Sequence, residues 1–155
     1  TQKETFQSLL ATTLEGDCNM EVMQSVQGHI VNMMEEHKEN KDPEPLVLSK
    51  GALEMVLSAS GVEEEHRDAF AQRFEEEFGA DARLCPQNLV DKKQFEVRTP
   101  DVTIKVNPER SDLVETRIID GAGYILIRAE GGVEVNGVPI RLTPPEGEEQ
   151  GEQDF

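Results

Sequence analysis

Asp101, Glu115 and Arg117 are the residues of this chain whose types and spacing come closest to a catalytic set. Two carboxylates can share one divalent cation, because Mg²⁺ takes oxygen ligands and keeps several of its waters. A cation held in this way polarises a phosphate ester and activates a water molecule for its hydrolysis. The three residues therefore raise one enzymatic interpretation, a metal-dependent hydrolase.

The order Pro100-Asp101, then Glu115-Thr116-Arg117, resembles the Pro-Asp and Glu-x-Lys pattern of a large superfamily of metal-dependent nucleases. The resemblance implies that the two carboxylates bind the metal and that the cationic residue lies beside the attacked phosphate. The chain departs from that pattern, because Arg117 replaces the lysine and the run DGAGYILI leaves no room for the helix expected there. A second interpretation, which we favour, makes these residues ion pairs between neighbouring strands on a solvated face.

The loop NPERSD, residues 107–112, offers a second candidate site. Its turn-forming residues predict a hairpin connection, since Pro108 fixes its own φ and donates no hydrogen bond. Asp112 is expected to hold the shape of the loop by accepting backbone N–H bonds. Glu109 and Arg110 at the tip have no structural role in this prediction, so both are interaction candidates. Arg110 is either a simple solvated cation or a partner contact, because its planar guanidinium recognises carboxylates.

Histidine and cysteine residues form no metal-binding pattern in this sequence. His29 and His37 are eight residues apart on one predicted helix, too far to share an ion, and His66 has no ligand spacing with either. Cys18 and Cys85 belong to no Cys-x-x-Cys pair, which favours free thiols in a reducing compartment. No glycine-rich phosphate loop precedes a helix. We therefore expect no cofactor and no resident metal.

The charge of the chain is strongly negative and unevenly spread. The 155 residues carry a net charge of −17, of which −4 lies in residues 1–41, −7 in 42–86, −1 in 87–142 and −5 in 143–155. Without a run of Lys and Arg, binding to nucleic acid or to an anionic membrane is disfavoured. No apolar run is long enough to span a bilayer and no signal peptide opens the chain, so we expect a cytoplasmic protein. The partner expected is a protein, and the oligomeric state stays open.

Apolar residues at steps of three and four predict helices in the first half of the sequence. Asn19 and Ser49 are each positioned to cap a helix start. Phe70, Phe74 and Phe78 recur every four residues and predict one buried helix face. A proline-containing linker separates this part of the chain into two pairs of helices.

After residue 86 the apolar period changes from the helical value to the strand value of two. Alternating runs continue to residue 142, joined by connections too short for a helical crossover. We predict an α+β fold, with about four N-terminal helices followed by an antiparallel meander sheet of five or six strands and the helices packed on one sheet face. The expected domains are a helical pair at 1–41, an α+β core at 42–142 with helices at 49–79 and the sheet at 93–142, and an acidic flexible tail at 143–155.

Several strings in the chain, among them PLVLSKGALEMVLSASGV, FEVRTPDVTIKVNPERSDLVETRIIDG and VEVNGV, resemble one bacterial family. This is the uncharacterised domain of unknown function 4317, found mainly in Firmicutes, and the resemblance is to its C-terminal part over residues 2–140. It implies a piece of a longer cytoplasmic protein and supplies no catalytic residue. We therefore expect a non-enzymatic interaction or regulatory module, whose partners include the N-terminal part of its own polypeptide. The alternative is the hydrolase that uses Asp101 and Glu115.

Overall fold

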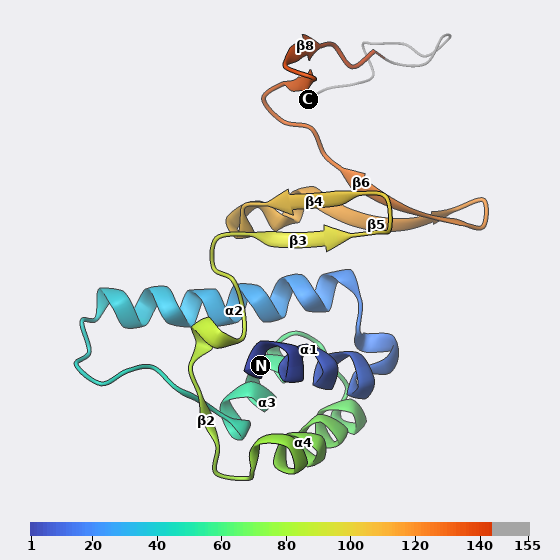
Figure 1. The fold of residues 1–155 in the computed structure, drawn as a ribbon. Coiled ribbons are helices and arrows are strands. Elements are labelled where there is room, and N and C mark those ends of the chain that lie inside the picture. Colours follow the sequence, from blue (N-terminus) through green and yellow to red (C-terminus); the bar gives the residue numbers. More distant parts are fainter. Residues whose placement is uncertain (144–155) are drawn as a thin grey trace.

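The computed structural model describes residues 1–143, with helices on one side of the molecule and hairpins on the other (Figure 1). The predicted acidic tail, residue 143 apart, lies outside the described residues. The helices of the described part are α1 (Gln2–Thr13), α2 (Met20–Glu39), α3 (Lys50–Ala59) and α4 (Glu64–Phe78), and the 3₁₀ turns are η1 (Glu15–Asp17), η2 (Pro86–Asn88) and η3 (Pro108–Leu113). None of these helices is long and apolar enough to cross a membrane.

Two of the helices begin at the caps that the sequence predicts. The Asn19 side chain accepts a hydrogen bond from the backbone N–H of Val22 at 2.9 Å, and the Ser49 hydroxyl accepts one from Ala52 at 3.1 Å. Each bond satisfies one of the N–H groups that a helix start leaves unpaired.

The core lies among the helices, and the predicted phenylalanine face is at its centre. Phe70 and Phe74 are fully buried, whereas Phe78 packs at the edge of the core. The ring of Phe6 from α1 meets Phe70 edge-on, with 6.3 Å between the ring centroids. Because aromatic rings bury large areas and favour such edge contacts, these rings fix the packing of α1 against α4.

The strands form four separate antiparallel pairs rather than one sheet. The pairs are β1 (Leu48–Ser49) with β2 (Arg83–Leu84), β3 (Phe95–Arg98) with β4 (Thr103–Val106), β5 (Val114–Ile119) with β6 (Ala122–Ile127), and β7 (Val133–Val135) with β8 (Val138–Ile140). The prediction of a mixed α and β chain with N-terminal helices is confirmed. The prediction of a five- or six-stranded meander packed on the helices by one face is wrong.

The connections explain why the meander does not form. The segment NPERSD, predicted to join two paired strands, forms η3 instead and places β4 and β5 in different hairpins. The Gln24 amide of α2 donates to the backbone carbonyls of Ser111 and Val114, both at 2.8 Å. A side chain of α2 therefore occupies the backbone carbonyl at the start of β5 that a neighbouring strand would need for pairing. After β6, Gly131 and Gly132 both have positive φ and turn the chain away from a continued ladder.

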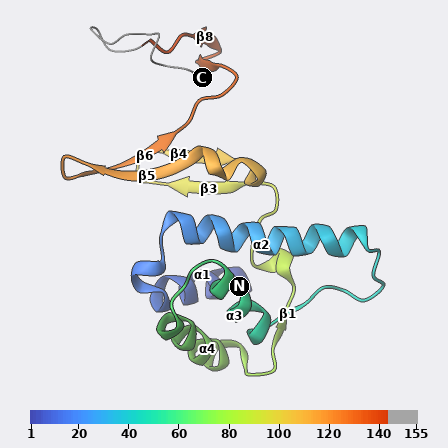
Figure 2. The same cartoon turned by 180° about the vertical axis from the view of Figure 1, so that it is seen from behind.

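Helix α2 lies between the other helices and the hairpins in both views (Figures 1 and 2). Besides Gln24, it contributes Gln27, whose amide donates to the carbonyls of Asp91 at 2.8 Å and Gln94 at 2.9 Å. The two glutamines are one helical turn apart, so both project toward the hairpins from the same face of α2. Their hydrogen bonds connect the helical half, residues 1–89, to the strand half, residues 90–143.

Candidate functional site

The three residues of the hydrolase interpretation lie on two different hairpins. Asp101 is exposed in the turn between β3 and β4, and Glu115 and Arg117 are exposed on β5. The Arg117 Nη2 atom is 2.9 Å from Glu115 Oε1. This ion pair runs along one strand, whereas the sequence favoured pairs between neighbouring strands. Because Glu115 is paired with Arg117, its charge is already balanced within β5.

Only one set of three or more side chains in residues 1–143 is close enough to share a cation, and it contains neither Asp101 nor Glu115. The set is Asp17, Glu63 and His66, whose ligand atoms lie within 4.8 Å of one another. These residues join η1 to the start of α4. No local sequence pattern marks these residues as a set, because Asp17 lies 46 residues from Glu63.

The contacts of Asp17 explain the arrangement. Its Oδ2 atom accepts the backbone N–H of Glu63 at 2.9 Å and lies 2.7 Å from His66 Nδ1. Glu63 is the N-cap residue of α4 and makes no side-chain capping bond, so Asp17 supplies a carboxylate there from a distant segment. His66, only 13% exposed, also places Nε2 3.2 Å from Glu15 Oε2. The set thus fastens η1 to α4 through groups that already satisfy one another.

These contacts shift two pKa values in opposite directions. The hydrogen bond to Asp17 raises the pKa of His66 above its ordinary value, and the nearby negative charge of Glu15 adds to the effect. The backbone N–H of Glu63, followed by His66, lowers the pKa of Asp17. The result favours a protonated imidazole facing an ionised carboxylate.

The loop residues Glu109 and Arg110 have different surroundings. Glu109 is exposed, and its N–H donates to the Asn107 side chain at 3.0 Å, which closes the turn at the start of η3. Arg110 Nε is 3.2 Å from Asp112 Oδ1, and its Nη2 is 2.9 Å from Glu130 Oε1. Asp112 therefore contacts guanidinium groups. The sequence had predicted that it would accept backbone N–H bonds instead.

Arg110, Asp112, Arg128 and Glu130 form a closed charge cluster. Arg128 completes it with contacts of 3.2 Å to Asp112 Oδ2 and 2.8 Å to Glu130 Oε2. Arg110 lowers the pKa of Asp112 and of Glu130, while Asp112 raises the pKa of Arg110. The cluster ties η3 to the end of β6 with a balanced charge. All four side chains are solvated, so the geometry is held by the network more than by any single pair.

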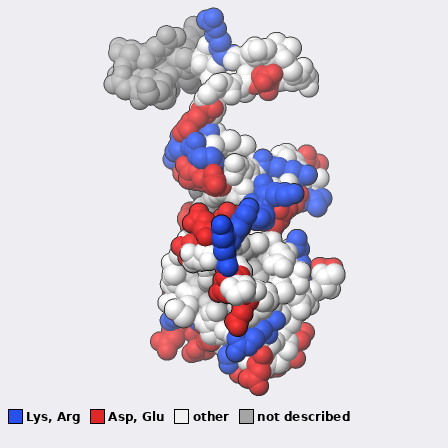
Figure 3. Space-filling view, turned by 90° about the vertical axis from the view of Figure 1, so that its left-hand side faces the viewer, with Lys and Arg blue, Asp and Glu red and all other residues white. Residues whose placement is uncertain are grey.

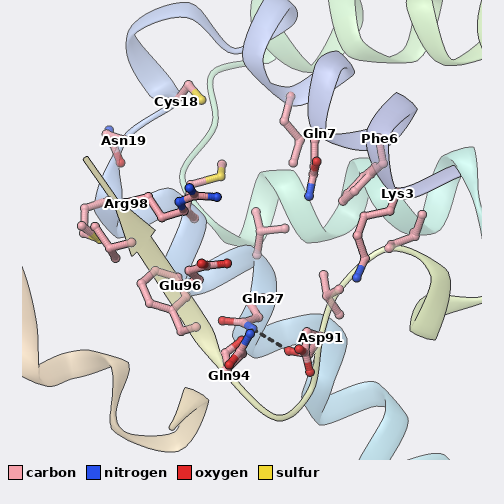
Figure 4. A pocket seen from close by; sticks show the side chains of 18 of the residues that line it. Lys3, Phe6, Gln7, Cys18, Asn19, Gln27, Asp91, Gln94, Glu96 and Arg98 are labelled. Atoms are coloured by element: carbon pink, nitrogen blue, oxygen red, sulfur yellow. Dashed lines mark hydrogen bonds between the residues drawn. The ribbon is translucent and has the colours of Figure 1, made fainter. Parts of the chain in front are cut away.

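A groove of about 650 Å³ lies between α1, the N-terminal part of α2 and β3 (Figure 4). Apolar side chains from the helices line its floor, including Phe6, Met23 and Val26. In Figure 4, Glu96 and Arg98 of β3 lie along the opposite wall. The groove therefore combines an apolar floor with a charged margin.

The wall of this groove is the open edge of β3. Phe95, Glu96, Val97 and Arg98 all line it, although alternate residues of a strand point to opposite faces. A surface touched by four successive residues runs along the edge of a strand. β3 pairs only with β4 in the described chain, so its other edge has no strand partner. The edge can therefore accept main-chain hydrogen bonds from an extended segment.

Lysines gather around a second hollow, of about 510 Å³, near the C-terminal part of α2. Lys3, Lys38, Lys92 and Lys93 line it, together with one carboxylate, Asp91. Figure 3 views the molecule from this side and shows Lys and Arg side chains over the middle of the face. The cluster combines three separate segments, which is why the sequence shows no basic run. It brings four cationic side chains together around one hollow of the described part of this acidic chain.

The hairpins leave apolar side chains uncovered. Within residues 1–143, ten large apolar residues are exposed, and nine of them lie between the β3–β4 turn and residue 142. They are Val102, Ile118, Ile119, Tyr124, Ile127, Val135, Val138, Ile140 and Leu142. The exception is Met55 on α3. Their concentration on one half of the described chain makes the hairpins a candidate interaction surface.

A helical core followed by separate two-stranded hairpins defines a mixed α/β protein. The family described as Domain of unknown function (DUF4317) matches residues 1–138, so the chain belongs to that family, as its sequence strings predict. No curated protein and no solved structure matches the chain.

Proposed function

We propose that this chain is a non-enzymatic protein-interaction module whose strand half receives the partner. The observation that carries the proposal is the concentration of nine exposed large apolar residues on the hairpins, against one on the helices. An isolated two-stranded hairpin is marginally stable in water and gains stability when another strand or surface covers it.

The energetics favour a protein partner. Covering one fully exposed Ile or Tyr side chain contributes about 1.5–3 kcal/mol before the cost of association. Ile118 is 76% exposed and Tyr124 47%, so both have much area left to bury. The open edges add main-chain hydrogen bonds that a small molecule cannot supply along a whole strand. A longer cytoplasmic bacterial polypeptide that contains this module would supply such a surface from its own chain or from another protein.

Site-specific photo-crosslinking tests the proposal. A photoreactive phenylalanine analogue replaces Tyr124 on the hairpin in one variant and Met55 on the helical half in the control, and both proteins are produced in their native host. Both original side chains are apolar and exposed. We expect discrete covalent protein adducts from position 124 and none from position 55. No adduct from position 124, or the same adducts from both, would refute the module.

A further inference from the structure

Strand β6 is the longest strand of the described chain without a charged residue. Its six residues, AGYILI, contain no charge, and the strand pairs only with β5. Natural edge strands are usually protected by a charged residue, a proline or a bulge, because an unprotected edge pairs with other chains. The run is instead bounded by one charge of each sign, Asp120 before it and Arg128 after it.

The register of the hairpin shows which backbone groups are free on this edge. The N–H of Arg128 donates to the carbonyl of Leu113 at 2.8 Å, so Leu113 and Arg128 are a hydrogen-bonded pair. Antiparallel pairs alternate between bonded and non-bonded. Counted along β6 from the bonded residue Arg128, the residues Ile127, Ile125 and Gly123 belong to non-bonded pairs. Their N–H and C=O groups therefore point to the open edge of β6.

We propose that a second copy of this chain occupies the edge, with β6 pairing antiparallel to the partner's β6 about a twofold axis at Tyr124. This inference names the partner within the proposed interaction function and rests on it. In this register Gly123 faces the partner's Ile125, and both residues direct their backbone groups toward the shared edge. The result is one four-stranded sheet in the order β5, β6, the partner's β6, the partner's β5.

The flanking charges select this register. An antiparallel pair centred on Tyr124 places Asp120 opposite the partner's Arg128 at both ends of the interface, so that Asp120 would join the carboxylates that Arg128 already contacts in its own chain. Moving the axis to Ile125 would place Asp120 opposite the partner's Glu130, where like charges repel. Hydrogen-bond alternation permits an axis at either residue, and the flanking charges decide in favour of Tyr124.

The charge distribution of the chain also favours a contact between copies at the hairpins. Residues 1–41 and 42–86 carry net charges of −4 and −7, so two helical halves repel each other. Residues 87–142 carry only −1. The strand half is thus the described region through which two copies of a chain with a net charge of −17 can approach with the least repulsion.

Light scattering and sedimentation at protein concentrations from low micromolar to about 1 mM test the dimer, at about 150 mM salt so that charge repulsion is screened. We expect a concentration-dependent dimer for the original chain and a monomer for Tyr124→Lys, which brings two ammonium groups together at the axis. Ile118→Lys is the matched control, since Ile118 is a more exposed apolar residue of the same hairpin but lies away from the axis. The control is expected to dimerise as the original chain does.

A disulfide trap tests the register, after Cys18 and Cys85 are replaced by Ser. Only a residue on the twofold axis faces its own copy, so Tyr124→Cys is expected to form a covalent dimer under mild oxidation faster than Leu126→Cys or Ile118→Cys. A monomer throughout the concentration range, or equal trapping at all three positions, overturns the dimer. If crosslinks from position 124 then still reach another protein, the interaction module stands and only the second copy is excluded as its occupant. If no crosslink forms there either, both fail.

Discussion

Removal of the Gln24 amide is expected to loosen the strand half from the helical half. Gln24→Ala deletes two hydrogen bonds of 2.8 Å, to the carbonyls of Ser111 and Val114. A neutral hydrogen bond contributes about 1 kcal/mol net, so we expect a loss of about 2 kcal/mol in the free energy of unfolding. Val114 is only 2% exposed, which limits how easily water replaces the lost donor there.

Asn32→Ala is the matched control for this substitution. Asn32 is exposed on the same helix, and its amide donates to the Glu36 side chain at 3.3 Å instead of to the strand half. Both substitutions place alanine, the best helix former, in α2, so each gains a few tenths of a kcal/mol in helix propensity. The difference between the two variants therefore reports the contacts with the hairpin.

Urea unfolding followed by circular dichroism measures the free energies, and hydrogen exchange locates the effect. We expect amide exchange in β5 and β6 to accelerate in Gln24→Ala, while amides around Phe70 keep their protection relative to global unfolding. Gln24→Glu should be more damaging at neutral pH, because a carboxylate would face the two carbonyls without a proton to donate. A Gln24→Ala loss within about 0.5 kcal/mol of that of Asn32→Ala would show that the two bonds do not fasten the halves.

Three further predictions concern the core, the histidine contact and metal. Phe74→Ala should cost about 4 kcal/mol in urea unfolding because the ring is fully buried, and Phe78→Ala at the core edge should cost clearly less; equal losses would contradict the packing. Because Asp17 raises the pKa of His66 above 6.5, the stabilisation from this contact is complete below pH 6.5 and is lost as the pH rises through the raised pKa. The thermal midpoint of the original chain should therefore exceed that of His66→Gln below pH 6.5 and converge with it in alkaline buffer. A difference that does not change with pH would show that the charge of His66 is not the cause. A chelator should leave the thermal midpoint within a few degrees, because Asp17 and His66 already satisfy each other and the core supplies the folding free energy; a larger fall would reveal a structural metal.

The features that the sequence predicted correctly are local ones. The caps at Asn19 and Ser49 depend on side chains within three residues of their donors. The Phe70 and Phe74 face follows from the helical repeat alone. Such signals lie within one or two turns of the chain, where backbone geometry decides which groups meet.

The pairing of strands and the contacts between segments could not be predicted in the same way. Alternation of apolar and polar residues identifies the faces of a strand but not the neighbour at its edge. The bond from Gln24 to Val114 spans 90 residues, and the contact of Asp17 with His66 spans 49. No local sequence pattern marks any of these four residues as a partner in a long-range contact. Of the two carboxylates that contact Arg110, Glu130 comes from the segment after β6, which the predicted hairpin would have placed elsewhere.

The two halves of the chain bury apolar surface in different ways. All sixteen residues of the main core lie between Phe6 and Leu89, so the helical half closes on itself. From residue 90 to residue 143, only Phe95 and Val114 are buried among the apolar residues. The exposed apolar side chains of the hairpins therefore add little to the stability of the isolated chain. Covering them with another surface would remove that apolar area from water, and this is the gain on which the proposed interaction function rests.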